Sequence, residues 1–403
     1  MSSRAISPAS SLYVVMLGLL SALPPFGTDA GLPGLPGLAS EFGISTAAAT
    51  QTLTLFLLGF SIGPMIFGPL SDRYGRKPIL LFGVAVFSIA ALGCGLARSL
   101  DMTLALRFIG GVGAGAAASL PAAIVRDVYA DGLALSRQSM VALVNGVAPL
   151  VAPLLGAAVL AFGSWRAIHE TLAVLGAALF ALAALGYAET APRTAQQRQG
   201  SVLAASVASY RAVLSDRNYL LSTALLAATF GVMFAYITGS AGVFMTALGA
   251  TPTVYGMLFA CTAAGTIAGA ASNGRLAARY GSRVVLLSAV AANVVIAVVL
   301  LLVAIAHAGS IPLCAGLVIA SNFCAGIIMP NATHRALRGL GHVAGSAAAL
   351  QRGLQMVAGS AAGALVGLIG GDPLFAMASV MLLAAIVAFA SNRGASRDAS
   401  IPC

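Results

Sequence analysis

The chain has 403 residues, of which 59% are hydrophobic and only 8% are charged. A soluble protein carries about 25% charged residues, so the composition excludes a soluble globular protein and indicates one that spans a membrane. The net charge of +10 does not indicate nucleic-acid binding, because the basic residues are not interleaved with aromatic ones.

Hydrophobic runs of about 20 residues, long enough to cross a bilayer core about 30 Å thick, recur from Ser11 almost to the C-terminus. They predict an all-α integral membrane protein with twelve membrane-spanning helices. The predicted spans are 11–36, 49–70, 78–98, 101–125, 136–162, 166–188, 219–246, 253–277, 284–306, 311–332, 345–370 and 373–391.

The distribution of basic residues predicts how the chain is oriented. If the N-terminus lies inside, 18 of the 21 Lys and Arg residues fall on the inner face, Arg98 and Arg166 fall on the outer face, and Arg107 lies within a span. Lys and Arg are enriched in cytoplasmic segments of membrane proteins. This bias predicts a multi-pass protein of the bacterial inner membrane with both termini in the cytoplasm.

The chain is predicted to form two six-helix halves. A polar segment, 189–218, separates an N-terminal bundle (1–188) from a C-terminal bundle (219–403) and is expected to be a cytoplasmic linker. GPLSDRYGRK (68–77) follows the second span, and GRLAARYGSR (274–283) follows the eighth. Such internal repeats are typical of alternating-access transporters. The acidic residue is not repeated, because Ala278 stands at the place that corresponds to Asp72.

Five motifs spread along the chain resemble those of one family. GPLSDRYGRKP resembles the signature of the loop between helices two and three of the major facilitator superfamily, and TDAGLPGLP resembles the first helix of its bicyclomycin/chloramphenicol resistance branch. RFIGGVGAG with RDVY resembles the fourth-helix pattern, and NGVAPLVAPLLGA resembles the fifth-helix antiporter pattern. PNATHRAL with HVAGSAAAL resembles the connection between helices ten and eleven. The resemblance implies the major facilitator fold with twelve helices in two pseudo-symmetric halves, and drug:proton antiport.

The first span carries a carboxylate, Asp29, among residues that weaken helices. An Asp at the centre of a membrane helix costs about 2.5–3.5 kcal/mol on insertion scales. Irregular backbone is tolerated there only beside protein or cavity water. We predict a kinked helix beside a polar cavity, in which Asp29 binds a proton or a substrate cation. The alternatives are a solvated Asp29 near the outer surface, and a helix end at LPGLP. The prolines concerned are Pro24, Pro25, Pro33 and Pro36.

Arg107 in the fourth span is the expected partner of Asp29, since both fall at a similar depth in the outer half. An adjacent Arg keeps a carboxylate ionised and burial favours its neutral form, so a site balanced between the two can exchange a proton for a substrate. The resemblance implies these same roles; a static ion pair is the alternative. No Asp or Glu occurs between Arg217 and Gly371, which leaves Glu170 as the second coupling candidate, or alternatively as a solvated residue at the outer rim.

The loop after the second span is predicted to form a cytoplasmic gate. In the family that it resembles, this loop contacts the opposite half and holds the outward-facing state. The end of the fourth span is expected to supply ion-pair partners for the loop. Solvated charges that obey the positive-inside rule are the alternative. The gate residues are Gly68, Asp72, Arg73, Gly75, Arg76, Lys77, Arg126 and Asp127.

Two glycine-rich stretches are predicted to serve helix packing. In the fifth span Pro149 and Pro153, with Gly146 and Gly156, are expected to bend the helix and let a neighbour approach closely. Packing of small residues in membranes would explain these glycines but not both prolines. The run GGVGAGAAAS (110–119) follows no strand and lacks the lysine of a phosphate-binding loop, so close helix packing is the expected role.

The second half supplies candidates for a substrate pocket, with packing inside the bundle or against lipid as the alternative. These candidates are Tyr236, Phe259, Asn322 and Gln355. The chain also departs from the family pattern, with Gly31 in place of Tyr, and Pro64 and Gly110 in place of Gln. The loss of three polar side chains predicts a pocket that selects by size and apolarity more than by hydrogen bonding.

These features predict a secondary transporter that exports small amphipathic drugs or metabolites in exchange for protons. It is expected not to be an enzyme, to use no cofactor or metal, and to be monomeric. Its partners would be the substrate, protons and the lipid bilayer, with no nucleic acid. A proton-coupled importer or facilitator of a small polar solute is the alternative on the same fold. A membrane enzyme or receptor would need a catalytic constellation or a sizeable soluble domain, and the sequence contains neither.

Overall fold

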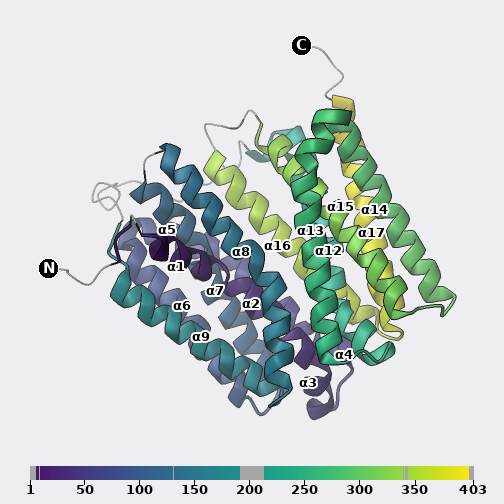
Figure 1. Ribbon diagram of the computed structural model, residues 1–403, viewed down its shortest axis with the longest axis horizontal. Helices are drawn as coiled ribbons and strands as arrows, with labels where there is room; N and C mark the ends of the chain where they lie inside the picture. Colours follow the sequence, from purple (N-terminus) through teal and green to yellow (C-terminus); the bar gives the residue numbers. More distant parts are fainter. Residues whose placement is uncertain are drawn as a thin grey trace. The chain divides into compact units, whose positions relative to one another are not determined.

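The computed structural model describes residues 6–8, 10–129, 131–190, 213–338, 340 and 344–398 (Figure 1). Within this range the side chains of residues 69, 72, 131, 132, 135, 344–346, 349 and 395–398 are not described. Most of the predicted linker and the side chain of Asp72 therefore lie outside the described part.

The described chain is helical throughout apart from short connections, which confirms the predicted fold class. Among the described residues, eleven helices are long and apolar enough to cross a membrane, and the bent pair Ser11–Ser21 and Leu23–Phe42, counted as one span, brings the number to twelve. The elements are α1 (Ser11–Ser21), α2 (Leu23–Asp29), η1 (Leu32–Gly34), α3 (Leu35–Phe42), α4 (Thr46–Ala49), α5 (Gln51–Tyr74), α6 (Arg76–Leu96), α7 (Leu100–Val128), α8 (Asp131–Leu160), α9 (Trp165–Gly186), α12 (Arg217–Ala241), η2 (Gly242–Ala247), α13 (Pro252–Tyr280), α14 (Ser282–Ile305), α15 (Ile311–Leu337), α16 (Ala344–Ile369) and α17 (Pro373–Asp398).

The first span is broken where the sequence places its prolines. The bend between α1 and the following helical segment is 41°. Pro24 and Pro33 each lie in the first turn of a new helical segment, α2 and η1, where the missing N–H of proline has no partner to lose. The predicted kink is therefore present, and it leaves Asp29 as the last residue of α2.

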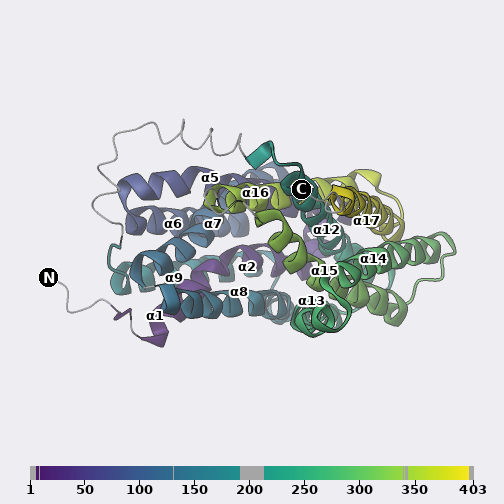
Figure 2. The ribbon, with the colours of Figure 1, turned by 90° about the horizontal axis from the view of Figure 1, so that it is seen from above.

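Met1–Gly37 and Leu55–Ser201 form the first compact unit. Its core joins α1, α6, α7 and α9 through buried apolar side chains that include Leu17, Phe87 and Leu120. α6 lies against both α7 and α9 (Figures 1 and 2). A Cβ atom built on Gly111 of α7 would overlap the carbonyl oxygen of Phe56 on α5. The glycine run therefore permits close helix packing, as predicted.

Leu38–Thr54 and Val202–Cys403 form the second compact unit. α12 packs against α15, α16 and α17, and both views show α12 beside α17 (Figures 1 and 2). α15 packs against both α13 and α14. The core between α12, α14 and α15 contains Leu225, Val290 and Ile328, all fully or almost fully buried.

The inclusion of residues 38–54 in the second unit is not signalled by the sequence. The Ser360 hydroxyl of α16 donates to the carbonyl oxygen of Thr54, 2.8 Å away. A Cβ built on Gly363 would lie 3.0 Å from the hydroxyl oxygens of both Thr54 and Thr238. One helical turn further on, a Cβ on Gly367 would lie 3.1 Å from the Ala47 carbonyl oxygen. Glycine on α16 thus lets this segment approach its backbone.

Candidate functional site

Asp29 is buried at the break in the first span. Asp29 is 4% exposed, and the hydroxyl of Thr28 donates to its Oδ1 atom at 2.8 Å. The break positions this carboxyl, because α2 ends at Asp29 and η1 starts only three residues later. The buried carboxyl lies on the predicted irregular backbone, whereas a polar cavity beside it stays a prediction. The reading of Asp29 as a solvated surface residue does not fit this burial.

Arg107 of α7 lies in the same unit and is 5% exposed. Its guanidinium carbon sits 4.3 Å from the centre of the Phe56 ring, a distance at which a cation is attracted to the face of an aromatic ring. The same ring packs on α2, since a Cβ built on Gly27 would lie 2.5 Å from the Phe56 Cζ atom. Phe56 thus contacts both the helix that carries Asp29 and the guanidinium of Arg107. Direct pairing of Asp29 with Arg107 stays a prediction.

His169 is a further buried polar residue, which sequence reasoning did not single out. It is 6% exposed, its ring lies edge-on to Trp165 with 5.9 Å between centroids, and its Nδ1 atom has no hydrogen-bond partner among the described residues. A Cβ built on Gly34 of η1 would lie 3.0 Å from Trp165 Cβ, so the start of α9 packs on the broken first span. The only sequence feature that could have indicated a role for His169 is the presence of a histidine within a predicted span.

Glu170, the second predicted coupling residue, lies next to His169 but is exposed. Its Cγ atom would lie 2.8 Å from a Cβ built on Gly95, near the end of α6. The structure therefore separates the two candidate carboxyls by environment, with Asp29 buried and Glu170 at the surface. This contrast favours Asp29 as the group whose charge state can depend on a binding event.

The predicted gate loop is held by ion pairing and capping. Arg76 Nε donates to Asp127 Oδ2 at 3.0 Å, with both side chains nearly buried, and Arg76 Nη1 donates to the Ser71 hydroxyl at 2.6 Å. Arg73 and Arg126 are exposed. Gly75 adopts a φ of 103°, which suits glycine best. The end of the fourth span thus reaches this loop through Asp127.

Glu189 binds the backbone of this loop, and the sequence did not indicate it as a site residue. Its Oε1 accepts from the backbone N–H of Arg76 at 2.9 Å, and its Oε2 accepts from that of Lys77 at 3.0 Å. Lys77 Nζ in turn donates to the Ala184 carbonyl oxygen at 2.8 Å. A carboxylate at a helix N-terminus satisfies free N–H groups and faces the positive end of the helix dipole. Its position 112 residues away in the chain hides this role in the sequence.

We expect Glu189→Gln to destabilise the first unit by about 1 kcal/mol, the usual size of an N-terminal cap. The amide can accept at one oxygen only and carries no charge. Thermal unfolding in detergent measures the effect, and Glu170→Gln is the matched control because that carboxyl is exposed. Equal unfolding temperatures for both variants and the unmodified protein would show that Glu189 does not stabilise α6.

The four residues of the fifth-helix pattern lie on α8, which contains Pro149 and Pro153 within one helix. A Cβ built on Gly156 would overlap the carbonyl oxygen of Ala30, the residue after Asp29. A Cβ on Gly146 would meet nothing within 4 Å. Gly156 is therefore the position at which α8 approaches the broken first span, whereas Gly146 makes no such contact.

Three of the four pocket candidates meet at α13 in the second unit, where Tyr236 of α12 and Asn322 of α15 contact residues of the helix that carries Phe259. The rings of Tyr236 and Phe259 stack with 5.6 Å between centroids, and the Tyr236 hydroxyl lies 3.1 Å from that of Thr262. One turn further along, the Thr266 hydroxyl donates to Asn322 Oδ1 at 3.3 Å. Tyr236, Phe259 and Asn322 are all buried, and so is Gln355 on α16. These contacts hold Tyr236, Phe259 and Asn322 inside the unit; a role in binding substrate stays a prediction for all four residues.

Membrane-length helices with a buried carboxyl and a buried guanidinium inside them indicate a multi-pass membrane protein with a functional site in its membrane-spanning part, and transport is one role of such groups. The comparisons agree. The family model described as Major Facilitator Superfamily matches residues 17–364. An uncharacterised MFS-type transporter of Bacillus subtilis, YdgK, is 31% identical over 386 residues, which is 95% of each chain.

Two further relatives carry resistance names. A bicyclomycin resistance protein homologue of Haemophilus influenzae is 30% identical over 84% of each chain. A chloramphenicol resistance protein of Pseudomonas aeruginosa is 32% identical over 87% of this chain and 83% of its own. Among solved structures, an inward-facing bacterial homologue of the human lysosomal transporter Spinster has a TM-score of 0.73 at 17% identity, covering 98% of this chain and 100% of its own.

The chain belongs to the major facilitator superfamily, in the drug-efflux branch that contains the bicyclomycin and chloramphenicol resistance proteins. It is a bacterial-type, multi-pass membrane transporter of small molecules, and it is not an enzyme.

Proposed function

We propose that this transporter exports small amphipathic compounds in exchange for protons. It would act as a monomer in the bacterial inner membrane, with both termini in the cytoplasm. The names of the resistance relatives support the substrate class, and the fifth-helix pattern on α8 supports antiport rather than import.

The observation that carries the proposal is the burial of Asp29 at the break in the first span. The sequence has no Asp or Glu between Arg217 and Gly371, so the second half has almost no carboxylate to offer for coupling. A buried carboxyl can hold a proton when the site is empty of other cations, and it can release that proton when a cationic or polarised substrate arrives. Asp29 is the residue to which we assign this exchange.

The neighbours of Asp29 support a change of charge state. The Thr28 hydroxyl can donate to the ionised carboxylate, and Phe56 contacts both α2 and the guanidinium of Arg107. Movement of the Phe56 ring would change how strongly Arg107 stabilises the ionised form. Arg107 would then respond to the charge of Asp29 without a permanent ion pair between them.

The experiment that tests antiport uses inside-out vesicles that contain the full-length protein and have an acidic interior. A phenicol or a lipophilic cation is added outside, and a pH-sensitive dye follows the interior. Export in the cell corresponds to uptake by these vesicles. The expected result is substrate uptake accompanied by loss of protons from the interior. Substrate uptake against its gradient should stop when a protonophore removes the pH gradient.

Two results would contradict the proposal. Substrate leaving preloaded vesicles together with protons would identify a proton-coupled importer. Uptake that only equilibrates the substrate, with no movement of protons, would identify a facilitator. Vesicles without the protein provide the control for passive permeation of lipophilic compounds.

A further inference from the structure

Residues 38–54 meet the rest of the second unit through several hydroxyl groups. The Ser360 hydroxyl donates to the Thr54 carbonyl oxygen at 2.8 Å, and the hydroxyl oxygens of Thr46 and Thr246 lie 3.4 Å apart. The segment follows the first span, so it lies on the predicted outer face. We call its contacts with α12, η2 and α16 the outer seal.

Two hydroxyl groups in the outer seal are buried without a partner. The hydroxyl oxygens of Thr54 and Thr238 are inaccessible to solvent and make no hydrogen bond within the described part of the chain. Each lies 3.0 Å from the position of a Cβ built on Gly363, so both face the same glycine of α16. A glycine inside a helix offers them only C–H groups, which form weak hydrogen bonds at best. An unpaired buried hydroxyl disfavours the state in which it is buried.

Other threonines in the same helices show how such a hydroxyl is usually satisfied. The hydroxyl of Thr50 donates to the backbone carbonyl oxygen three residues earlier at 2.6 Å. That of Thr229 on α12 donates to the carbonyl oxygen four residues earlier at 2.8 Å. A helical threonine can make this bond to its preceding turn. Thr54 and Thr238 do not make it, because their hydroxyls face the glycine of α16 instead.

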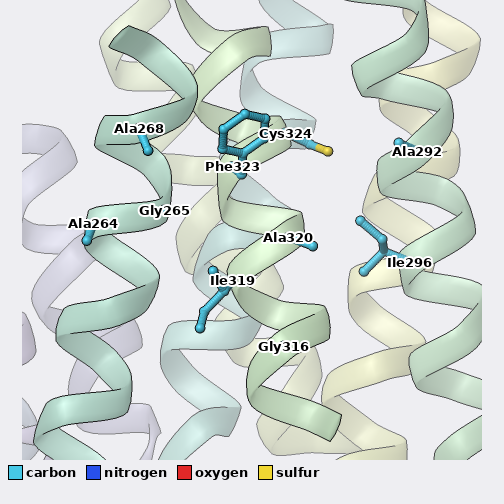
Figure 3. Close-up of a pocket in the computed structure, with 10 residues that line it drawn as sticks. All are labelled: Ala264, Gly265, Ala268, Ala292, Ile296, Gly316, Ile319, Ala320, Phe323 and Cys324. Atoms are coloured by element: carbon cyan, nitrogen blue, oxygen red, sulfur yellow. The ribbon is translucent and has the colours of Figure 1, made fainter. Parts of the chain in front are cut away.

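Small residues have a different effect elsewhere in the second unit. Between α13, α14 and α15 they leave an open groove of about 690 Å³, in which six of the ten lining residues are alanine or glycine (Figure 3). At Gly363 the side chains of Thr54 and Thr238 close over the glycine, and no solvent reaches the two hydroxyl oxygens. In this orientation the hydroxyls gain partners only when the outer seal opens and water enters.

α5 connects the outer seal to the first unit. This helix is continuous from Gln51 to Tyr74; its first residues, up to Thr54, belong to the second unit, and the rest belongs to the first. Alternating access requires one half of a transporter to move against the other. Any such movement therefore acts on the contact of Thr54 with α16.

We propose that Thr54 and Thr238 are positioning residues for transport, whose unpaired hydroxyls weaken the outer seal and so determine how often it opens. In the closed seal both hydroxyls are held dry against Gly363. When residues 38–54 separate from α16, water pairs with both hydroxyls, and this gain favours the open seal. The proposal goes beyond the exchange at Asp29, because it requires a transporter that opens and closes but does not require the exchange of protons.

The test measures how often the seal opens, as the labelling rate of a thiol introduced by Thr50→Cys. Thr50 is buried, and its hydroxyl oxygen lies 3.4 Å from a Cβ built on Gly367. Methanethiosulfonate ethyltrimethylammonium, a water-soluble thiol reagent, reaches this position only when the seal is open. Peptide mass spectrometry of the full-length protein in detergent separates this thiol from the native ones, and the exposed Cys261 monitors the reagent.

Thr54→Val and Thr238→Val, each added to this background, should slow labelling by about fivefold or more. Valine has the shape of threonine, and it removes the unpaired hydroxyl that disfavours the closed seal. When the seal closes faster than the thiol reacts, the labelling rate follows the population of the open state. The double variant should be labelled more slowly than either single variant.

Thr223→Val is the matched control. Thr223 lies on the same helix as Thr238, about 22 Å away along its axis, and its hydroxyl is also buried and unpaired among the described residues. The substitution should raise the unfolding temperature as Thr238→Val does, but it should leave the labelling rate unchanged.

Three results would overturn the proposal. Unchanged or faster labelling in both Thr54→Val and Thr238→Val would show that the hydroxyls do not weaken the seal. Equal slowing by Thr223→Val would show that labelling follows overall stability. No labelling at Thr50→Cys, in a protein whose Cys261 reacts, would show that the seal does not open. Slower labelling in the two seal variants alone supports the proposal, whether or not protons are exchanged in vesicles.

Discussion

Asp29→Asn should reduce substrate-induced proton movement in vesicles by about a hundredfold or more, the lower end of the effect when a proton-transferring group is removed. Asparagine has the shape of a neutral aspartic acid and can accept the same hydrogen bond from Thr28, but it cannot release a proton. The variant protein should fold normally, because it removes a charge from a buried position. Proton release on substrate addition, measured in weakly buffered detergent solution, should disappear as well.

The control for this substitution is Asp101→Asn, which neutralises an exposed carboxylate in the first turn of α7. It should leave proton movement unchanged. Glu170→Gln tests the second candidate in the same assay. Full proton movement in Asp29→Asn combined with its loss in Glu170→Gln would transfer the coupling role to Glu170. Retention in both variants would remove both Asp29 and Glu170 from the mechanism.

Gly156→Ala should destabilise the protein, although alanine is the better helix former. Its Cβ would overlap the Ala30 carbonyl oxygen, which is backbone and cannot rotate away, so α8 and the broken first span must move apart. Overpacking of this kind costs about 1–3 kcal/mol, more than the about 1 kcal/mol that alanine gains over glycine in a helix. Since Ala30 adjoins Asp29, transport should fall along with the unfolding temperature in detergent.

Gly146→Ala on the same helix is the matched comparison. A Cβ there meets nothing within 4 Å, so only the gain in helix propensity remains and the unfolding temperature should stay the same or rise. Destabilisation by both variants to the same extent would show that flexibility of α8, rather than contact with Ala30, is what glycine provides. A neutral Gly156→Ala would contradict the close approach itself.

Hydrophobic length and proline placement were sufficient to predict most of the fold. The twelve spans follow from apolar runs that match the bilayer, and the break beside Asp29 follows from Pro24 and Pro33, because proline can start a helical segment but interrupts one that is already formed. Asp127 was expected near the gate loop because it ends the fourth span. These predictions depend on neighbours in sequence or on a known motif, and the structure reproduces them.

The remaining site features depend on contacts between distant segments, which one sequence does not encode in readable form. Glu189 reads as the start of a polar linker, yet it caps α6. Phe56 reads as an ordinary apolar residue of a span, yet it contacts both α2 and Arg107. Aromatic residues are common throughout apolar membrane helices, so the sequence does not show which residues a given ring, such as that of Phe56, will contact. That is decided by how the helices pack.

Residues 38–54 limit where this chain can be divided. α5 starts in the second compact unit and continues into the first, although the only long polar segment in the sequence lies at 189–218. A C-terminal fragment produced by cleavage there would lack the carbonyl that receives the Ser360 hydroxyl. It would also expose the α16 surface at Gly363 and Gly367. The two fragments would consequently not fold independently, because the N-terminal fragment carries residues 38–54, which pack in the second compact unit.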